Sequence, residues 1–320
     1  LFNRERQMKK IPVILDCDTG TDDAIAIAEA LYAPELDVRA ITTVAGNVSL
    51  HYTSQNTLNI VRYLGFDTRV AVGAAGPIFG EIIHSSATHG DTGLGPLVVP
   101  QSADAFYAKN AVETILEEAR RAPGELVLIP VAPMTNIAHA VLAYPELVSL
   151  IKEIVFMGGA MVGGNMTTTA EFNAWADPEA MSIVLNCGIP CRMIGLDVTE
   201  KAVLNAEDAR FFRGLGTKAG NLTADLLDFM FQRFSEGGED ALMHDGLAVA
   251  AVVQPQVVKT QRFYVDCECS GKYTRGHTYV AANEIFFKKG EKPERCEVAL
   301  ELDLPLFKQF LRRVIARSQA

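Results

Sequence analysis

The stretch LDCDTGTDDA, residues 15–24, contains four aspartates and follows directly on a short apolar run. The run is rich in β-branched residues, which predicts a buried strand that ends at Asp16 and Asp18. Side chains two residues apart on a strand share a face, so these two carboxylates should point the same way. The Thr-Gly-Thr that follows is typical of a turn, and beyond it apolar residues recur with a helical period. Asp22 and Asp23 are therefore expected in the first turn of a helix.

Four carboxylates this close together require a compensating interaction. A helix N-terminus favours negative charge by only about 0.3–1 kcal/mol per group. Crowded carboxylates therefore either raise their pKa values or bind a cation. A ligand set made only of oxygen atoms is the one that Ca²⁺ or Mg²⁺ prefers, rather than Zn²⁺. The stretch predicts a site for a hard divalent cation, whereas simple helix capping would account for Asp22 alone.

Two known aspartate loops are alternatives to such a site. An EF-hand that begins at Asp16 requires Gly at its sixth position and Glu at its twelfth. Those positions hold Thr21 and Ile27, which excludes it. A phosphatase with an aspartyl nucleophile has Asp-x-Asp-x followed by Thr or Val, and here Gly20 occupies that last position. The phosphatase stays as a second hypothesis, with Asp16 as nucleophile and Mg²⁺ as cofactor.

Strand and helix patterns alternate along most of the chain. Predicted strands cover residues 11–15, 38–44, 69–72, 126–130, 151–157 and 192–196, with further strands within 261–302. Predicted helices begin at residue 22 and cover 49–64, 105–121, 136–143, 178–186, 206–234 with an interruption at 214–220, 247–253 and 306–317. The alternation predicts an α/β fold, a single domain with a mostly parallel open sheet flanked by helices. Polar motifs follow several of these strands, so they should meet at the carboxyl edge of the sheet.

The motifs occur in a fixed order. They are Asp16 to Asp23, Thr42 to Asn47, Pro130 to Asn136, Met157 to Gly159, Gly164-Asn165, Glu171 to Asn173, Asp177 to Ala180 and His244-Asp245. This order resembles the nucleoside hydrolase family, whose N-terminal motif is Asp-x-Asp-x-x-x-Asp-Asp. The resemblance runs from residue 11 to about residue 250. It implies that family's fold and hydrolysis of ribonucleosides to ribose and free base, for nucleoside salvage. Residues 33–37 and 44–49 are most similar to bacterial members that accept both purine and pyrimidine nucleosides.

The resemblance also implies one Ca²⁺ per chain and assigns roles to the aspartates. The implied metal ligands are Asp18, Asp23, Asp245 and the backbone carbonyl of Val131. Asp18 is in addition the implied general base for the attacking water. Asp22 matches the residue that binds the 2′-hydroxyl, and Asp16 is similar to an outer group that orients its neighbours.

A further set matches the family's substrate-binding residues. Its members are Asp22, Asn47, His89, Met157, Asn165, Glu171, Phe172 and Asn173. Amides and carboxylates suit sugar hydroxyls, which both donate and accept hydrogen bonds. Met157 and Phe172 would form an apolar wall, and a spacing of two residues places Glu171 and Asn173 on one face. Asp177-Pro178 is instead typical of a helix start and is left outside the site.

The departing base requires its own contacts. His244 is the candidate, because it precedes an implied metal ligand at a predicted helix start and its pKa range suits proton transfer. His89 is a second candidate. Some family members have tyrosines ahead of His244, where this chain has the sequence FQRF at 231–234. The same site without turnover would be a calcium-dependent nucleoside- or sugar-binding protein, but Asp18 and His244 together favour an enzyme, since binding alone needs no general base.

Composition limits the partners. The formal charge of −10 over 320 residues argues against non-specific nucleic-acid binding, which needs a basic face. No apolar stretch approaches the ~18–20 residues of a membrane span. The six cysteines lack zinc-site spacing, so we expect free thiols in a cytoplasmic protein. Residues 8–320 are expected to form the domain, with residues 1–7 a cloning remnant or disordered extension. The family resemblance implies a homotetramer or homodimer.

Overall fold

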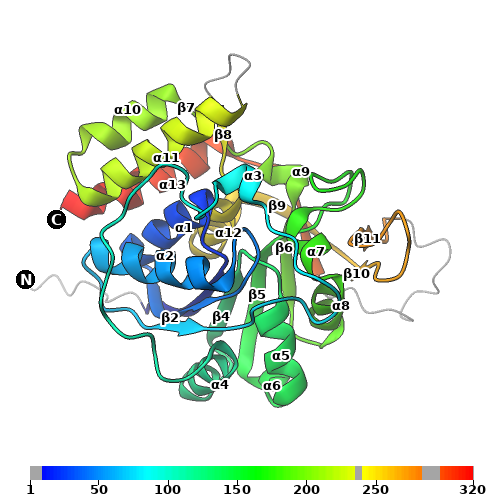
Figure 1. Ribbon diagram of the computed structural model, residues 1–320. Coiled ribbons are helices and arrows are strands. Elements are labelled where there is room, and N and C mark those ends of the chain that lie inside the picture. The colour runs from blue at the N-terminus through cyan, green and yellow to red at the C-terminus, as the bar shows by residue number, and fades with distance from the viewer. Residues whose placement is uncertain (1–8, 235–239, 283–295, 320) are drawn as a thin grey trace, which may run out of the picture.

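A computed structural model describes residues 9–234, 240–282 and 296–319, which surround one eight-stranded sheet (Figure 1). The expected extension at residues 1–7 lies outside the described residues. So do most of the predicted loop at 235–240 and part of the strand-rich segment 261–302. Within the described residues, no helix is long and apolar enough to cross a membrane.

The central sheet is mostly parallel. Its strands are β1 (Ile11–Cys17), β2 (Leu36–Thr43), β3 (Val70–Val72), β4 (Leu126–Pro130), β5 (Ile151–Met157), β6 (Cys191–Ile194), β9 (Val258–Phe263) and β12 (Cys296–Leu302). They lie in the order β3-β2-β1-β4-β5-β6-β12-β9, and only β9 runs antiparallel to its neighbour. Two short antiparallel pairs lie apart from it: β7 (Val203–Asn205) with β8 (Asp240–Leu242), and β10 (Val265–Cys267) with β11 (Thr278–Val280).

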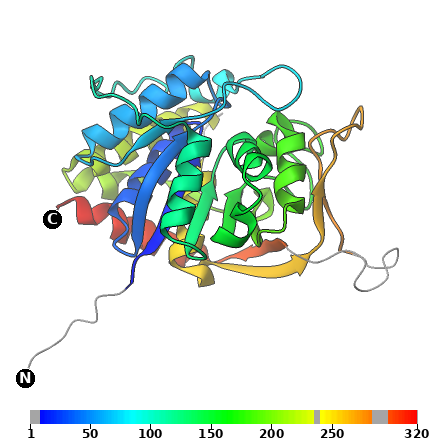
Figure 2. The same cartoon turned by 90° about the horizontal axis from the view of Figure 1, so that it is seen from below.

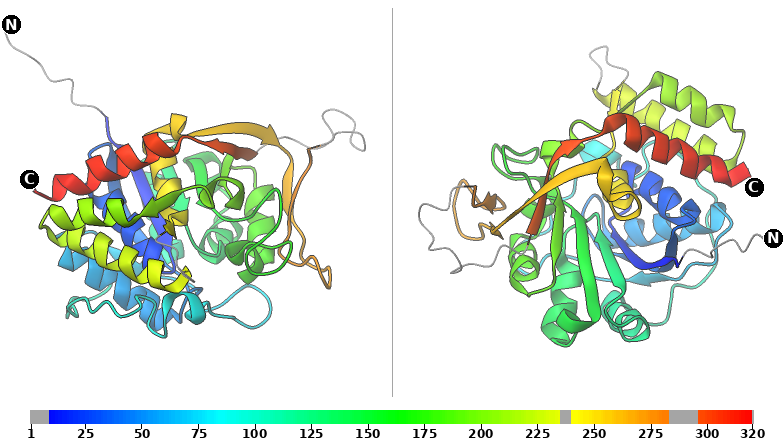
Figure 3. Two further views of the ribbon diagram at one scale, coloured as in Figure 1. Left: turned by 90° about the horizontal axis from the view of Figure 1, so that it is seen from above. Right: turned by 180° about the vertical axis from the view of Figure 1, so that it is seen from behind.

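Helices cover both faces of the sheet, each over its own hydrophobic core. The first core includes residues of α1 (Thr21–Tyr32), α2 (Leu50–Tyr63), α9 (Leu196–Thr199), α10 (Ala206–Gly214), α11 (Lys218–Phe234), α12 (His244–Val253) and α13 (Leu304–Ala316). The second includes residues of α4 (Ala111–Arg121), α5 (Thr135–Ala143), α6 (Leu147–Leu150), α7 (Phe172–Ala176) and α8 (Pro178–Asn186). Figure 2 shows the green helices of the second group together on one side, and Figure 3 shows α13 (red) with the first group on the other. A single turn, α3 (Ser86–His89), lies in the long connection before α4.

The strand order places a ligand site at β1. This strand lies between β2 and β4, so the chain first runs outward to β3 and then returns to the opposite side of β1. Open α/β sheets bind ligands at such a switch point, outside the carboxyl ends of the strands. The aspartate stretch begins in β1 and continues into α1, which puts it at this point.

The α/β fold with a mostly parallel sheet is confirmed, and two predicted helices begin three or more residues away from the predicted start. The helix expected from residue 105 begins at Ala111, because Asn110 caps it. The Asn110 side chain accepts from the Glu113 N–H at 2.9 Å, and Glu113 accepts from the Asn110 N–H at 3.1 Å. Helix α12 begins at His244 rather than at residue 247, which brings the predicted site residues into its first turn.

Glu29 is a buried carboxyl group that the sequence pattern does not predict. It lies on α1 with no exposed surface, and neither of its oxygens has a hydrogen-bond partner among the described residues. It faces α12, where a Cβ at Gly246 would come within 2.2 Å of Oε1. Burial raises the pKa of Glu29 well above its usual range, so the folded protein holds it as a neutral acid.

We expect Glu29→Gln to stabilise the protein increasingly as pH rises from about 5 to 8. The unfolded chain loses the Glu29 proton near pH 4.3. The folded chain keeps it to higher pH, so the wild type loses unfolding free energy above that point, whereas the glutamine variant does not titrate. The two melting temperatures should be similar at pH 5. At pH 8 the melting temperature of the variant should be a few degrees higher, because each kcal/mol of unfolding free energy raises it by roughly 2–4 °C. A difference that does not change with pH would contradict a neutral Glu29.

Candidate active site

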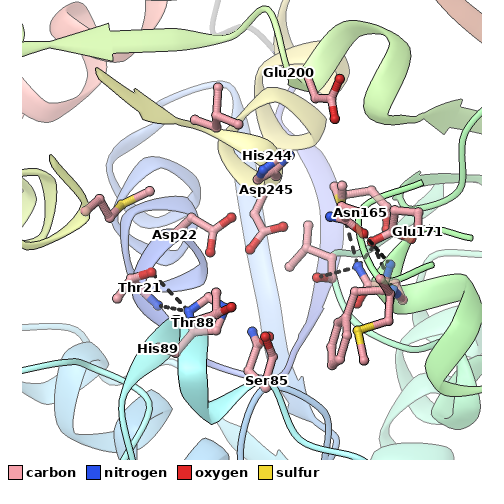
Figure 4. Close-up of a pocket in the computed structure, with 18 of the residues that line it drawn as sticks. Thr21, Asp22, Ser85, Thr88, His89, Asn165, Glu171, Glu200, His244 and Asp245 are labelled. Carbon is pink, nitrogen blue, oxygen red and sulfur yellow. Dashed lines mark hydrogen bonds between the residues drawn. The ribbon is translucent and has the colours of Figure 1, made fainter. Parts of the chain in front are cut away.

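One cavity of about 360 Å³ opens at the carboxyl edge of the sheet (Figure 4). The predicted site residues that line it are Asp22, Asn47, His89, Val131, Met157, Asn165, Glu171, Phe172, Asn173, His244 and Asp245. Asp16, Asp18 and Asp23 are buried and are not part of the lining. These residues come from the segments that follow β1, β2, β4 and β5 and from the first turn of α12. They meet at one place, as the strand pattern predicts.

Three carboxylates lie together at the floor of the cavity: Asp22 and Asp245 line it, and Asp23 is buried behind them. Asp22, Asp23 and Asp245 each offer an oxygen within 4.8 Å of the others. The first two lie in the first turn of α1 and the third in the first turn of α12, and these helices are in contact. Figure 4 shows Asp22 and Asp245 turned toward each other in the middle of the cavity. This group could bind a metal ion.

Asp18, the fourth predicted carboxylate, lies against this group. Its Oδ2 accepts from the Asn47 N–H at 2.7 Å, and its N–H donates to Asp23 at 3.2 Å. Gly46 is needed here, because a Cβ at that position would lie 2.1 Å from Asp18 Oδ2. The second oxygen, Oδ1, is buried without a hydrogen-bond partner among the described residues. An unsatisfied buried carboxylate oxygen is costly unless a cation or another ligand binds it.

Asp23 is held by hydrogen bonds from the turn after β1 and from the loop after β2. Its Oδ2 accepts from the Gly20 N–H at 2.8 Å and from Asn47 Nδ2 at 3.0 Å. The side chain of Asn47 therefore donates directly to one of the aspartates, and the residue also lines the cavity.

Burial and mutual repulsion raise the pKa values of these acids. Burial, with the charge of Asp23 adding to it, raises the pKa of Asp18 well above its usual range. Burial and Asp22 do the same for Asp245, and the pKa of Asp23 rises to about 7. A cation among the carboxylates would favour their ionised forms. The donor set is oxygen only, which fits a hard divalent ion such as Ca²⁺.

Asp16 is buried beneath the residues that line the cavity. Its Oδ1 accepts from Thr42 Oγ1 at 2.5 Å and from Asn136 Nδ2 at 2.8 Å. Asn136 also donates to the Thr43 carbonyl at 3.0 Å. The carboxyl group thus connects β1 with β2 and α5, and burial raises its pKa to about 7.

A second wall comes from the segment that follows β5. Glu171 caps α7 and accepts from the backbone N–H groups of Asn173 at 2.9 Å, Ala174 at 3.1 Å and Gly159 at 2.8 Å. Burial raises its pKa to about 7. Asn165 Oδ1 accepts from the Phe172 N–H at 2.9 Å. Glu171 and Asn173 both line the cavity, but a spacing of two residues does not place them on one face here, because they belong to the start of a helix.

Asn173 connects this wall to the cavity floor. Its Nδ2 donates to the Val131 carbonyl at 3.3 Å and to the Met157 carbonyl at 3.1 Å. The Val131 N–H donates to the Asp16 carbonyl at 2.8 Å. The peptide of Val131 is therefore fixed between β1 and α7, so its carbonyl holds a defined position. Asp177, by contrast, caps α8 as predicted, because its side chain accepts from the Ala180 N–H at 3.1 Å.

Two histidines also line the cavity. The Thr21 N–H and Oγ1 donate to His89 Nδ1 at 3.1 and 3.0 Å, so the single proton of the neutral ring lies on Nε2. Burial lowers the pKa of His89 to about 4. His244 Nδ1 is 2.8 Å from Thr199 Oγ1, and burial lowers its pKa as well. Both rings are held neutral at pH 7 in reach of the cavity.

Several lining residues were not predicted from the sequence. They are Thr21, Ser85, Thr88, Met166, Glu200, Met230, Arg233 and Leu242. Only Arg233 carried a signal, as part of the segment where this chain departs from the family pattern. The others come from loops and helix ends that the fold brings together, and nothing in their local sequence marks them.

Comparison with known proteins gives a consistent result. The family described as inosine-uridine preferring nucleoside hydrolase matches residues 13–309. A pyrimidine-specific ribonucleoside hydrolase of Citrobacter koseri is 40% identical over 310 residues, 96% of this chain and 98% of that protein. One of Escherichia coli is 41% identical over 287 residues, 88% of this chain and 91% of that protein.

Solved structures of nucleoside hydrolases are also similar to this chain. The purine-preferring ribonucleoside hydrolase from Gardnerella vaginalis superposes with a TM-score of 0.89 at 33% identity, covering 96% of this chain and 99% of that one. A plant nucleoside hydrolase superposes with a TM-score of 0.91 at 27% identity and the same coverage. On the family match and these relatives, the chain belongs to the inosine-uridine preferring nucleoside hydrolase family, whose members are enzymes that hydrolyse the N-glycosidic bond of ribonucleosides.

Proposed function

We propose that the protein is a Ca²⁺-dependent hydrolase of purine and pyrimidine ribonucleosides that releases ribose and free base for nucleoside salvage. One observation carries the proposal. The carboxylate floor, the wall of amide and carboxyl groups after β5 and the two neutral histidines all face a single cavity. The first suits a divalent cation, the second sugar hydroxyls, and the third a departing base.

The residues that would hold the ion are Asp18, Asp23, Asp245 and the carbonyl of Val131, with Asp22 beside them. Asp22, Asp23 and Asp245 offer oxygens within 4.8 Å of one another, and the partnerless Oδ1 of Asp18 supports a role for that residue. When bound, Ca²⁺ would lower the pKa of a water molecule and bind the ribose diol. Asp16, through Thr42 and Asn136, would keep the strand ends around the ligands in register.

The chain's own residues then divide the reaction between them. Asp18 takes the proton of the attacking water as general base. Asp22 accepts from the 2′-hydroxyl, and Asn47, Asn165, Glu171 and Asn173 bind the remaining sugar hydroxyls. Met157 and Phe172 supply an apolar wall against the ring and exclude water from it. An oxocarbenium-like state benefits from carboxylates close to the developing positive charge.

His244 and His89 would meet the base. Both residues line the cavity, and Nδ1 of each ring has a hydroxyl partner, which leaves Nε2 as the nitrogen available to a ligand. His244 is proposed as the group that protonates or orients a purine as it departs. His89 is proposed as a substrate-binding residue.

We also propose that residues 8–320 act as one domain, supported by the continuous sheet, and that the chain assembles as a homotetramer or homodimer, which rests on the resemblance alone. A cytoplasmic location is consistent with six free cysteines.

The test of this function is a panel of nucleosides with controlled metal. We expect the purified protein to contain about one Ca²⁺ per chain, to release reducing sugar from uridine and inosine, and to lose that activity with a chelator and regain it with Ca²⁺. One equivalent of zinc, or no calcium, would contradict the metal assignment. Nucleoside binding without sugar release would indicate a binding protein, and Mg²⁺-dependent phosphate release a phosphatase.

A further inference from the structure

Arg233 places a guanidinium in the cavity wall. It lies in the last turn of α11 and lines the cavity. Its Nη1 donates to the backbone carbonyl of Thr88 in α3. Figure 4 shows Thr88 across the cavity from Asn165 and Glu171. The guanidinium is therefore anchored across the cavity from Asn165 and Glu171, two of the proposed ribose-binding residues.

The positive charge of Arg233 lies near His89, one of the two histidines proposed to meet the base. It is half-buried, and burial lowers its pKa while the charge of Asp22 raises it; a guanidinium stays protonated under these conditions. Its Thr88 partner is the neighbour of His89 in α3, and Arg233, His89 and His244 all line the cavity. The positive charge lowers the pKa of both histidines. Among the described residues that line the cavity, Arg233 is the one Lys or Arg.

His89 cannot supply a second positive charge near Arg233. Its Nδ1 accepts two hydrogen bonds from Thr21, so the ring has no place for a second proton without losing them. A base that leaves with negative charge therefore faces a fixed cation, and preorganised charge of this kind stabilises transition states strongly in a water-poor site.

We propose, on the basis of the hydrolase function proposed above, that Arg233 stabilises the negative charge on a departing pyrimidine, so that the site favours pyrimidine ribonucleosides. As the bond between C1′ and N1 breaks, its electron pair passes to N1 and delocalises onto the C2 carbonyl oxygen beside it. The water oxygen bonds to C1′ and its proton passes to Asp18. The base leaves as an anion and takes a proton from solvent. A guanidinium offers donors in a planar fork that suits this oxygen and nitrogen pair.

Purines lack this arrangement. Their glycosidic nitrogen is flanked by two ring carbons without exocyclic oxygen, so the developing charge stays on ring nitrogens. Proton transfer to those nitrogens, rather than a nearby cation, is then the more effective help. Arg233 should thus contribute much to uridine hydrolysis and little to inosine hydrolysis.

The test compares leaving groups in Arg233→Met, which keeps a long apolar stem and removes the charge. We expect kcat to fall by about 10²–10³-fold with uridine, the span for loss of one preorganised electrostatic group. With 5-fluorouridine, whose fluorine already stabilises the base anion, and with p-nitrophenyl riboside, the loss should be clearly smaller. The uridine-to-inosine rate ratio should fall, and Arg233→Lys should restore part of the uridine rate.

Lys218→Met is the matched control, because it removes a positive charge from the first residue of the same helix, where the ammonium lies over the Tyr63 ring. It should change none of the rates. Equal losses of Arg233→Met on uridine, 5-fluorouridine and p-nitrophenyl riboside would show a merely structural role and overturn the proposal, as would an unchanged uridine rate. A wild-type protein inactive on all substrates would overturn the hydrolase function itself, and the role of Arg233 with it.

Discussion

Asp18→Asn should lower kcat for uridine and inosine by about 10²–10⁴-fold, the usual contribution of a positioned general base. The amide keeps the shape of the side chain and can still accept from the Asn47 N–H, which lies 2.7 Å from Oδ2 in the wild type. It cannot take a proton from water. Because a general base contributes mainly in the transition state, a ribose analogue should still bind measurably. Reducing-sugar release and calorimetric titration measure the two quantities.

Two further measurements make this result specific. Asp37→Asn changes a surface carboxylate that pairs with Arg39 at 2.8 Å, and it should leave kcat unchanged. The calcium content of Asp18→Asn must also be measured, because loss of the ion would lower turnover without any role as base. Near-normal turnover with calcium retained would show that Asp18 is not the base.

His244→Ala should slow inosine hydrolysis by about 10²–10⁴-fold and leave p-nitrophenyl riboside hydrolysis nearly unchanged. A departing purine benefits from protonation, and the His244 ring lines the cavity with its Nδ1 held 2.8 Å from Thr199 Oγ1. p-Nitrophenolate leaves without a proton, so this substrate depends only on the ribose and metal-binding residues. Steady-state rates on both substrates give the ratio of the loss on inosine to the loss on p-nitrophenyl riboside, which tests the proposed role.

His139→Ala is the control, since that histidine is exposed on α5. Equal losses on the two substrates would mean that His244 supports the carboxylate floor through Asp245 instead of meeting the base. The acid would then have to be sought at His89 or in the segment 231–240, of which 235–239 lie outside the described residues.

Much of this fold could be predicted because its signals are local. The apolar run before Asp16 and the turn residues after Asp18 specify a strand, a turn and a helix within a few residues. The strand predicted over 151–157 and the helix over 178–186 have those bounds in the structure as β5 and α8. Parallel strands share a carboxyl edge, so the convergence of the motifs also followed from the sequence.

Other features depended on contacts between distant segments. The sequence by itself determined the α/β class, the aspartate stretch at the end of β1 and the identity of most lining residues. Only the tertiary structure decided that Asp245 joins Asp22 and Asp23 as the three acids with close oxygens, that Glu29 is buried against Gly246, and that Arg233 lines the same cavity as the two histidines. Local propensity specifies each helix, but the packing of α1, α11 and α12 over the sheet specifies which side chains meet, and no single window of sequence contains that information.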